Sequence, residues 1–380
     1  MTKKLLSFAA FMLLLASCTQ SRDDQPVQPI NSETSNYRSL DEGLKIADML
    51  FNTLGQTRSS FRTVKSVETI NRSTRSSSPG SAFHIVNYNN GGFALLSADK
   101  RLEAVFAISE AGQMNLSDTI HNKPLALYIR SIERVANRLN AKPANSKFPP
   151  TLDTMLNVDN SFKTFPILDP IFDRKELKNI MPIFHQRDPF NKYCFTISGE
   201  QAPVGCAPLA AGTLMGYYEW PQSYKGYTFD WTAMKSNRNH DGWAKLFSFL
   251  GQYENMNVNY RINGSGASSS TFYRTFANLG YKNMQLKAFS ISQVNYEMRE
   301  QKPLMVWGYD DQAGGHAWII DGAKYVEDYM NVYNEVITSY YYHCVWGWGG
   351  KDNGYFIFKN NINTDKYLFE DIQYMSNLQH

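Results

Sequence analysis

The spacing of apolar residues predicts a small domain of helices and strands in the first half of the chain. Apolar positions at helical spacing predict a helix that begins at Ser39, with Glu42 three residues on as its capping-box partner. A second helix is predicted at 123–139. Between the two helices, an Asn-Asn-Gly-Gly turn at 89–92 joins two apolar runs into a hairpin. The predicted strands, one of them only a strand-like patch inside a polar loop, cover 64–70, 82–88, 93–98 and 104–108. This combination is typical of an α+β domain.

In the second half of the chain, the predicted helices come first and the strands follow. A run of small and apolar residues after Cys206 predicts a helix that Pro221 ends, and Pro208 fits because it falls in the first turn. Another helix is predicted at 267–279, closed by Gly280. The predicted strands cover 303–309, 317–320, 339–345 and 355–358. Helices followed by strands indicate an α+β domain.

The first 18 residues have the pattern of a targeting segment. Two lysines precede a short apolar run at 5–15, which is too short to span a bilayer. The run ends in Leu-Ala-Ser-Cys, which resembles a bacterial lipobox, so Cys18 is predicted to carry lipid and to become the new N-terminus. The alternative is an ordinary signal peptide cut near Ala16. Both interpretations place the protein outside the cytoplasm. The first anchors it to the outer membrane or cell surface, with release from the cell as an alternative, and the second predicts a secreted protein.

Polar stretches divide the remainder of the chain. Residues 19–36 are rich in Ser, Gln, Asp and Asn, which predicts a flexible tether. Residues 140–166 combine prolines, small polar residues and lysines, which predicts an exposed, cleavable linker with a boundary near 165. We therefore expect a signal peptide at 1–18, the tether, a domain with its linker at 37–165, and a second domain at 166–380.

Composition excludes several classes of function. The chain of 380 residues has 38 basic and 35 acidic side chains, and no basic patch or glycine-rich phosphate loop, so nothing points to nucleic acid or nucleotides. Cys194, Cys206, Cys344 and His316 lack the short paired spacing of a zinc site, and no metal or other cofactor is expected. In an oxidising compartment Cys194 and Cys344 could instead form a disulfide.

Cys206 stands at the predicted start of a helix. There the unpaired backbone N–H groups and the helix dipole favour an anion, so a thiol loses its proton more readily and becomes a nucleophile at neutral pH. The alternative is a structural cysteine buried in the core, a common fate of free cysteine.

His316 follows two glycines and precedes an apolar run that predicts a strand. Gly314 and Gly315 leave room for a substrate backbone to pass close to the imidazole. A histidine beside the thiol supplies the base that cysteine catalysis needs. The alternative is a histidine that bonds locally at the strand end.

Four blocks of the second half together resemble the streptopain-like cysteine peptidases, which have a papain-like fold. The blocks are Gln-x-x-Pro-Phe-Asn from Gln186, Gly-Cys from Gly205, Gly-His-Ala from Gly315, and Trp-Gly-Trp-Gly-Gly from Trp346. They occur in the order of the family and span most of the second domain. The upstream segment resembles the inhibitory pro-domain of the family.

The resemblance implies a papain-like two-lobed domain preceded by an α+β pro-domain, made as a zymogen that cleaves proteins or peptides. It implies that Cys206 is the nucleophile, that His316 is the general base and acid, and that Gln186 helps to form the oxyanion hole. It places Gly315 and Trp348 at the substrate. The pro-domain would be an intramolecular inhibitor.

The chain departs from the family at the position that orients the histidine. Papain-like enzymes have an Asn just before a Trp-Gly pair, whereas Cys344 and Val345 precede Trp346 here. We therefore expect Trp346, through its ring and indole N–H, to shield or position the imidazole. Asp321 lies at odd spacing along the strand from His316, on the opposite face, and is assigned to a turn.

The missing Asn leaves a second function open. A histidine without a carboxamide partner is held less firmly, so the protein could be a weakly active or inactive relative that acts as a binding or inhibitor-like surface lipoprotein. A cysteine amidase or acyltransferase on small substrates is a further alternative, which the long pro-domain disfavours. Phe184 also replaces a Trp of the family, which keeps an aromatic ring.

Overall fold

The computed structural model describes ten segments of the chain. They cover 37–54, 62–71, 81–116, 123–140, 182–236, 240–310, 314–329, 336–350, 352–358 and 372–380. The predicted signal peptide with Cys18, the tether, the linker from 141 on and the boundary near 165 lie outside these segments. Among the described residues, no helix has the length and apolarity needed to cross a membrane.

The N-terminal half contains the elements that its sequence predicts. They are α1 (Leu40–Leu54), β1 (Val64–Asn71), β2 (Ser81–Tyr88), β3 (Phe93–Ser97), β4 (Val105–Ser109) and α2 (Lys123–Asn140). The capping box is confirmed, because the Ser39 N–H donates to Glu42 at 2.8 Å and the Glu42 N–H donates to the Ser39 hydroxyl at 3.2 Å. The four strands are antiparallel neighbours in chain order.

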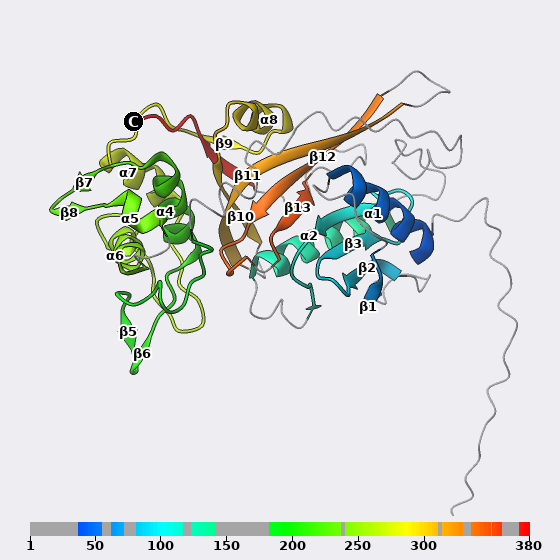
Figure 1. The fold of residues 1–380 in the computed structure, drawn as a ribbon, viewed down its shortest axis with the longest axis horizontal. Coiled ribbons are helices and arrows are strands. Elements are labelled where there is room, and N and C mark those ends of the chain that lie inside the picture. Colours follow the sequence, from blue (N-terminus) through cyan, green and yellow to red (C-terminus); the bar gives the residue numbers. More distant parts are fainter. Residues whose placement is uncertain are drawn as a thin grey trace, which may run out of the picture. The chain divides into compact units, whose positions relative to one another are not determined.

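In the described segments of the helical lobe, four helices and two short hairpins gather around one apolar core (Figure 1). The helices are α4 (Cys206–Tyr218), α5 (Trp231–Lys235), α6 (His240–Gly251) and α7 (Ser270–Asn278). The hairpins pair β5 (Thr196–Ile197) with β6 (Glu200–Gln201), and β7 (Ser223–Tyr224) with β8 (Tyr227–Thr228). The predicted helix at 267–279 begins three residues later than expected.

Helix α4 is buried on nearly all sides rather than along one stripe. Its buried residues run from Ala207 to Gly216 with one interruption at Thr213. A Cβ on Gly212 would lie 2.6 Å from the ring of Phe247 on α6, so glycine is needed for the two helices to pack this closely. A helix that is apolar all round belongs in a core, which explains why the sequence shows only a rough stripe.

The sheet lobe is built from the C-terminal strands and α8 (Ile291–Arg299). Its strands are β9 (Gln285–Ala288), β10 (Leu304–Asp310), β11 (Gly314–Tyr329), β12 (Val336–Val345), β13 (Gly354–Ile357) and β14 (Gln373–Ser376). Strand β11 is far longer than the predicted 317–320. The turn assignment of Asp321 is wrong, because this residue lies inside β11, where the register against β12 shifts between Ile320 and Gly322.

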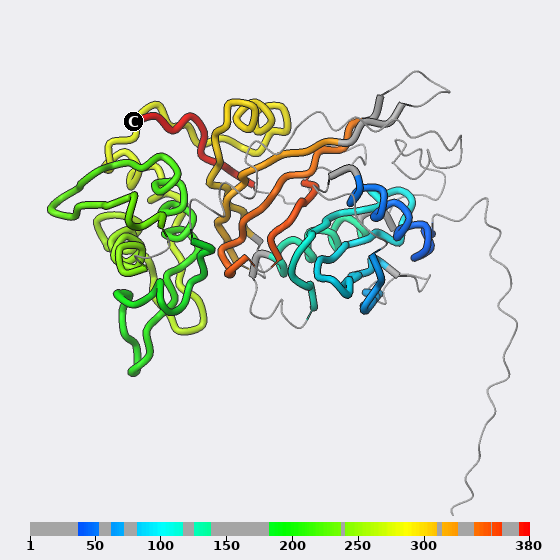
Figure 2. Tube along the Cα trace, viewed as in Figure 1, coloured from blue at the N-terminus to red at the C-terminus, as the bar shows by residue number. Residues whose placement is uncertain are grey.

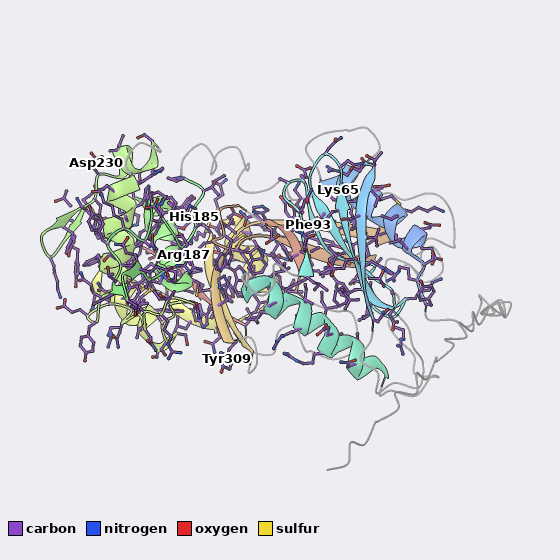
Figure 3. All side chains as sticks on the ribbon, turned by 90° about the horizontal axis from the view of Figure 1, so that it is seen from below. Lys65, Phe93, His185, Arg187, Asp230 and Tyr309 are labelled. Atoms are coloured by element: carbon purple, nitrogen blue, oxygen red, sulfur yellow. The ribbon has the colours of Figure 1, made fainter. Side chains whose placement is uncertain are left out.

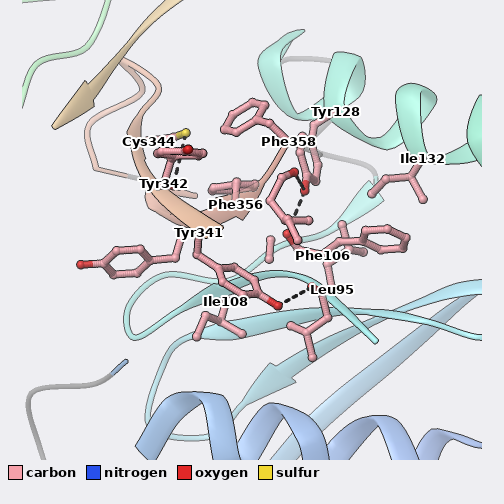
Figure 4. Close-up of a cluster of buried hydrophobic side chains, with 14 of the residues drawn as sticks. Leu95, Phe106, Ile108, Tyr128, Ile132, Tyr341, Tyr342, Cys344, Phe356 and Phe358 are labelled. Atoms are coloured by element: carbon pink, nitrogen blue, oxygen red, sulfur yellow. Dashed lines mark hydrogen bonds between the residues drawn. The ribbon is translucent and has the colours of Figure 1, made fainter. Parts of the chain in front are cut away.

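In the described part of the chain, both halves contribute to one sheet of ten strands, in the order β1-β2-β3-β4-β13-β12-β11-β10-β14-β9. The halves meet where β4 pairs with β13, with Ile108 opposite Tyr355 and Ala107 opposite Phe356. Figure 2 shows the cyan strands of the N-terminal half beside the orange-red strand β13 of the C-terminal half. Residues of both halves form a single apolar core around this pairing (Figure 4).

Candidate active site

Cys206 is the first residue of α4, as the sequence predicts. Gly205 caps the helix with a φ of 92°, and a Cβ there would lie 3.2 Å from the carbonyl oxygen of Ser265, so a glycine is required. The thiol is partly exposed, whereas Cys194 and Cys344 are buried. A partly exposed thiol at the start of a 13-residue helix is in the setting that stabilises a thiolate.

His316 lies near the start of β11 and is buried. Its Nε2 is 3.1 Å from the main-chain oxygen of Trp346. A carbonyl oxygen can only accept, so Nε2 carries the hydrogen and donates it. In the neutral ring Nδ1 is then the basic nitrogen, because the bond at Nε2 fixes the tautomer. The imidazole also stacks with the ring of Trp318, at 6.3 Å between centroids and 6° between planes.

Trp346 reaches the imidazole through its main chain. Its ring lies 6.4 Å from that of His316 and packs more closely on Trp318, at 5.2 Å, and on Phe356, at 5.0 Å. The described residues offer no acceptor to its buried indole N–H. Trp346 therefore bonds His316 through its main-chain carbonyl oxygen, and not through the indole N–H that the sequence suggested.

The corner after Trp346 rests on the helix that carries Cys206. Gly347 has a φ of 82°, and a Cβ there would lie 2.6 Å from the side chain of Leu209. Leu209 is in the first turn of α4, three residues after Cys206. The acceptor of the imidazole hydrogen bond is thus built into a loop that touches the nucleophile helix, which links the two lobes at the site.

Gln186 is buried between this loop and the segment before Cys206. The Val204 N–H donates to the Gln186 carbonyl oxygen at 2.9 Å. On its other side, His185 pairs with Trp348 in an isolated bridge. Figure 3 shows His185 and Arg187, the neighbours of Gln186, on the helical lobe beside the sheet strands. Gln186 and Trp348 therefore lie at the same junction as Cys206.

Known proteins resemble the chain over both halves. Residues 184–356 match the Peptidase C10 family, and residues 27–135 match the Spi protease inhibitor family. Streptopain from Streptococcus pyogenes is 23% identical over an alignment of 326 residues, and the match covers 73% of this chain and 74% of streptopain. This chain is a streptopain-like cysteine peptidase with an N-terminal pro-domain.

Two further relatives agree with this assignment. The thiol protease/hemagglutinin PrtT of Porphyromonas gingivalis is 24% identical over an alignment of 312 residues, and the match covers 71% of this chain and 33% of PrtT. The structure of a prointerpain A fragment from Prevotella intermedia superposes with a TM-score of 0.53 at 16% identity, and the match covers 82% of this chain and 98% of the fragment. The two-lobed fold with a preceding α+β pro-domain is thereby confirmed.

The other described cysteines of the peptidase are poor nucleophiles. Burial raises the pKa of the Cys194 thiol to about 11 and raises the pKa of Cys344 well above its ordinary value. Both thiols are free, so the disulfide considered between them is not formed. Among the residues that the structure describes, no group of three or more His, Cys, Asp or Glu side chains is arranged to hold a metal ion.

Two other predicted positions have clear surroundings. Phe184 packs its ring in the core of the helical lobe, against Phe190, Trp243 and Phe247 at 4.7 to 5.3 Å between centroids. Either a phenylalanine or a tryptophan ring serves at this position. Gly315 is exposed beside His316, as expected of a position that a substrate backbone approaches.

Asp321 pairs with another histidine. Its carboxylate is 2.5 Å from Nδ1 of His343, and both side chains are buried. They line a cavity of about 250 Å³ between the sheet and the later turns of α4, which contribute Thr213 and Tyr217. Neither Cys206 nor His316 lines this cavity.

Asn353 contacts Trp346 at the candidate active site, and no sequence pattern had pointed to it. Its side-chain oxygen accepts the main-chain N–H of Trp346 at 3.1 Å. It stands seven residues after Trp346 in a short polar loop, and nothing in that spacing marks a functional position.

Proposed function

We propose that the protein is an envelope-anchored cysteine endopeptidase, made as a zymogen, in which Cys206 attacks the peptide bond and His316 transfers the protons. The observation that carries this proposal is the position of Cys206 at the start of α4, with His316 held in one tautomer by the carbonyl of Trp346. The match to the Peptidase C10 family over 184–356 supports it.

The chemistry follows from these groups. Nδ1 of His316 accepts the thiol proton, and the thiolate adds to the carbonyl carbon of the substrate. The oxyanion then takes hydrogen bonds from the Cys206 backbone N–H and the Gln186 side chain. The imidazolium protonates the leaving amine, and water activated by His316 hydrolyses the acyl-enzyme. Loss of one oxyanion donor typically lowers kcat about 100- to 1,000-fold, which is the expected effect of Gln186→Ala.

The pro-domain would restrain this activity until it is removed. Its match to the Spi protease inhibitor family and its shared sheet with the peptidase support an intramolecular inhibitor. An enzyme that cleaves proteins needs such restraint, so protein substrates fit this proposal. Lipidation at Cys18, with anchoring to the outer membrane or cell surface, rests on residues 1–18 alone.

The alternative of an inactive binding protein arose from the missing Asn before Trp346. The carbonyl of Trp346 supplies an acceptor for the imidazole, so this departure no longer argues against activity. We therefore favour the peptidase.

Hydrolysis of casein by the processed full chain tests the proposal. Cys206→Ala should abolish hydrolysis, and His316→Ala should reduce it to near background, with unchanged circular dichroism. Cys194→Ala is the matched control, because this thiol is buried and protonated, and it should retain activity. An active Cys206→Ala protein would refute the proposal.

A further inference from the structure

We infer that Asn353 is a positioning residue for His316, acting through the main chain of Trp346. The inference rests on the proposed function and deepens it, because it assigns the task of the missing Asn to a residue on the other side of the Trp-Gly block.

Two hydrogen bonds meet on the backbone of Trp346. Its carbonyl oxygen accepts from His316 Nε2 at 3.1 Å, and its N–H donates to Asn353 Oδ1 at 3.1 Å. Trp346 follows the last residue of β12, so its N–H lies beyond the strand ladder. The Asn353 carboxamide supplies the partner that this buried residue needs.

The loop after Trp346 makes the hydrogen bond to Asn353 important. Gly347, Gly349 and Gly350 all have positive φ values, of 82°, 68° and 77°. Glycines allow many backbone conformations, so this loop has little stiffness of its own. A side-chain acceptor is held by its own packing, whereas a main-chain acceptor is held only as firmly as its loop. The hydrogen bond that restrains the Trp346 N–H therefore also restrains the Trp346 carbonyl oxygen, which orients the imidazole.

Asn353 is itself anchored from the pro-domain side. The Ser109 hydroxyl, at the end of β4, donates to the Asn353 carbonyl oxygen at 2.5 Å, and the Asn353 N–H donates to the Gly350 carbonyl oxygen at 3.4 Å. One residue thus contacts the pro-domain with its main chain and Trp346 with its side chain. When the pro-domain leaves, the hydrogen bond from Ser109 to Asn353 is lost. The hydrogen bond between the Trp346 N–H and Asn353 then has to hold the Trp346 carbonyl in place.

The test compares Asn353→Ala with Asn353→Asp in full chains processed by a trace of tagged wild-type enzyme that is then removed. Asp keeps an acceptor at the same position, whereas Ala removes it. We expect kcat of the Ala variant to fall about 10- to 100-fold with little change in KM, the size of effect seen when an outer partner of a ligating histidine is lost. The Asp variant should retain most of kcat.

The pH profile separates positioning from simple stability. With a poorly placed acceptor the imidazolium is less stable, so the alkaline limb of kcat/KM should move to lower pH in Asn353→Ala. Equal kcat and an equal pH profile in Asn353→Ala and wild type would overturn the inference, as would a change confined to KM. If the Ala variant does not fold, Asn353→Gln, whose longer side chain displaces the acceptor, should show the same loss, and wild-type kinetics in it would overturn the inference.

Failure of the proposed function gives a different result. In that case an epoxide inhibitor of papain-type enzymes would not label Cys206 of the wild type. If only the inference is wrong, the wild type is labelled and Asn353→Ala is labelled at the same rate.

Discussion

The hydroxyl of Tyr128, on pro-domain helix α2, lies 2.7 Å from the carbonyl oxygen of Ile357 in peptidase strand β13. It also lies 2.8 Å from the carbonyl oxygen of Phe106 in β4, so it bridges the two strands through which the halves join. Tyr341 makes a similar link, donating to the Val105 carbonyl oxygen at 3.0 Å (Figure 4). The pro-domain is thus joined to the peptidase by strand pairing and a shared core.

This joint predicts that the pro-domain stays bound at micromolar concentration after the linker is cut, and that dilution to the concentrations of an activity assay releases it. Separation would expose the edge of β13 and the apolar core around Tyr128, which is unfavourable in water. We expect full-length Cys206→Ala protein, cut in the 140–166 linker by a trace of wild-type enzyme, to elute from size exclusion as one complex at micromolar concentration. Two separated peaks under native conditions would contradict this. Tyr128→Phe, which removes only the hydroxyl, should weaken the complex.

A second prediction concerns Trp346, whose carbonyl bonds the imidazole while its ring packs on Trp318 and Phe356. Trp346→Phe should keep most of the turnover, because the carbonyl and part of the packing remain. Trp346→Ala should lower the free energy of unfolding by about 3–5 kcal/mol, as expected for a large buried side chain, and should reduce kcat at temperatures where the protein is still folded. Denaturant unfolding and steady-state kinetics measure the two effects. Wild-type turnover in the folded Ala variant would limit Trp346 to a structural role.

The third prediction uses two glycines with nearly the same backbone. Gly347 and Gly226 have φ values of 82° and 83°, but a Cβ at Gly347 would lie 2.6 Å from Leu209, whereas nothing lies within 4 Å at Gly226. Gly226→Ala should therefore cost only the backbone strain, about 1–2 kcal/mol. Gly347→Ala should cost more and should also lower kcat, because the neighbouring carbonyl of Trp346 shifts. Equal melting temperatures for the two variants would show that the loop does not rest on α4.

The fourth prediction concerns the reactivity of the thiols at different pH. Burial raises the pKa of Cys194 from an ordinary 9.0 to about 11, so the folded state keeps this proton after the unfolded chain has lost it. The stability from this group is complete below pH 9 and declines as pH rises from 9 towards 11. We expect iodoacetamide at pH 8 to label Cys206 and to spare Cys194 and Cys344 until the protein unfolds, as read by peptide mass. Early labelling of Cys194 would contradict its burial.

Much of the fold was predictable because its signals are local. The Ser39–Glu42 capping box and the turn at 89–92 are encoded by neighbouring residues, and α4 begins at Cys206 as expected. The alternation that marks β11 is interrupted by the shift at Asp321, so the sequence indicated only its first part.

The remaining features depend on contacts between distant segments. The pairing of β4 with β13 joins strands from the two halves of the chain, and no local pattern specifies it. The oxygen that bonds His316 belongs to the main chain, which every residue has, so Trp346 could be suspected only for its ring and indole. Asn353 acts through the Trp346 main chain, so no sequence pattern marks its role either.

We propose Cys206, assisted by His316, as the nucleophile of a peptidase. The most direct test of this proposal is mass spectrometry of the processed chain after reaction with an epoxide inhibitor of papain-type enzymes. We expect one adduct, on Cys206, that is absent from Cys206→Ala, forms much more slowly in His316→Ala, and stops substrate hydrolysis in step with its formation. An unmodified Cys206 in an active enzyme, or hydrolysis that persists after Cys206 is fully modified, would contradict the proposal.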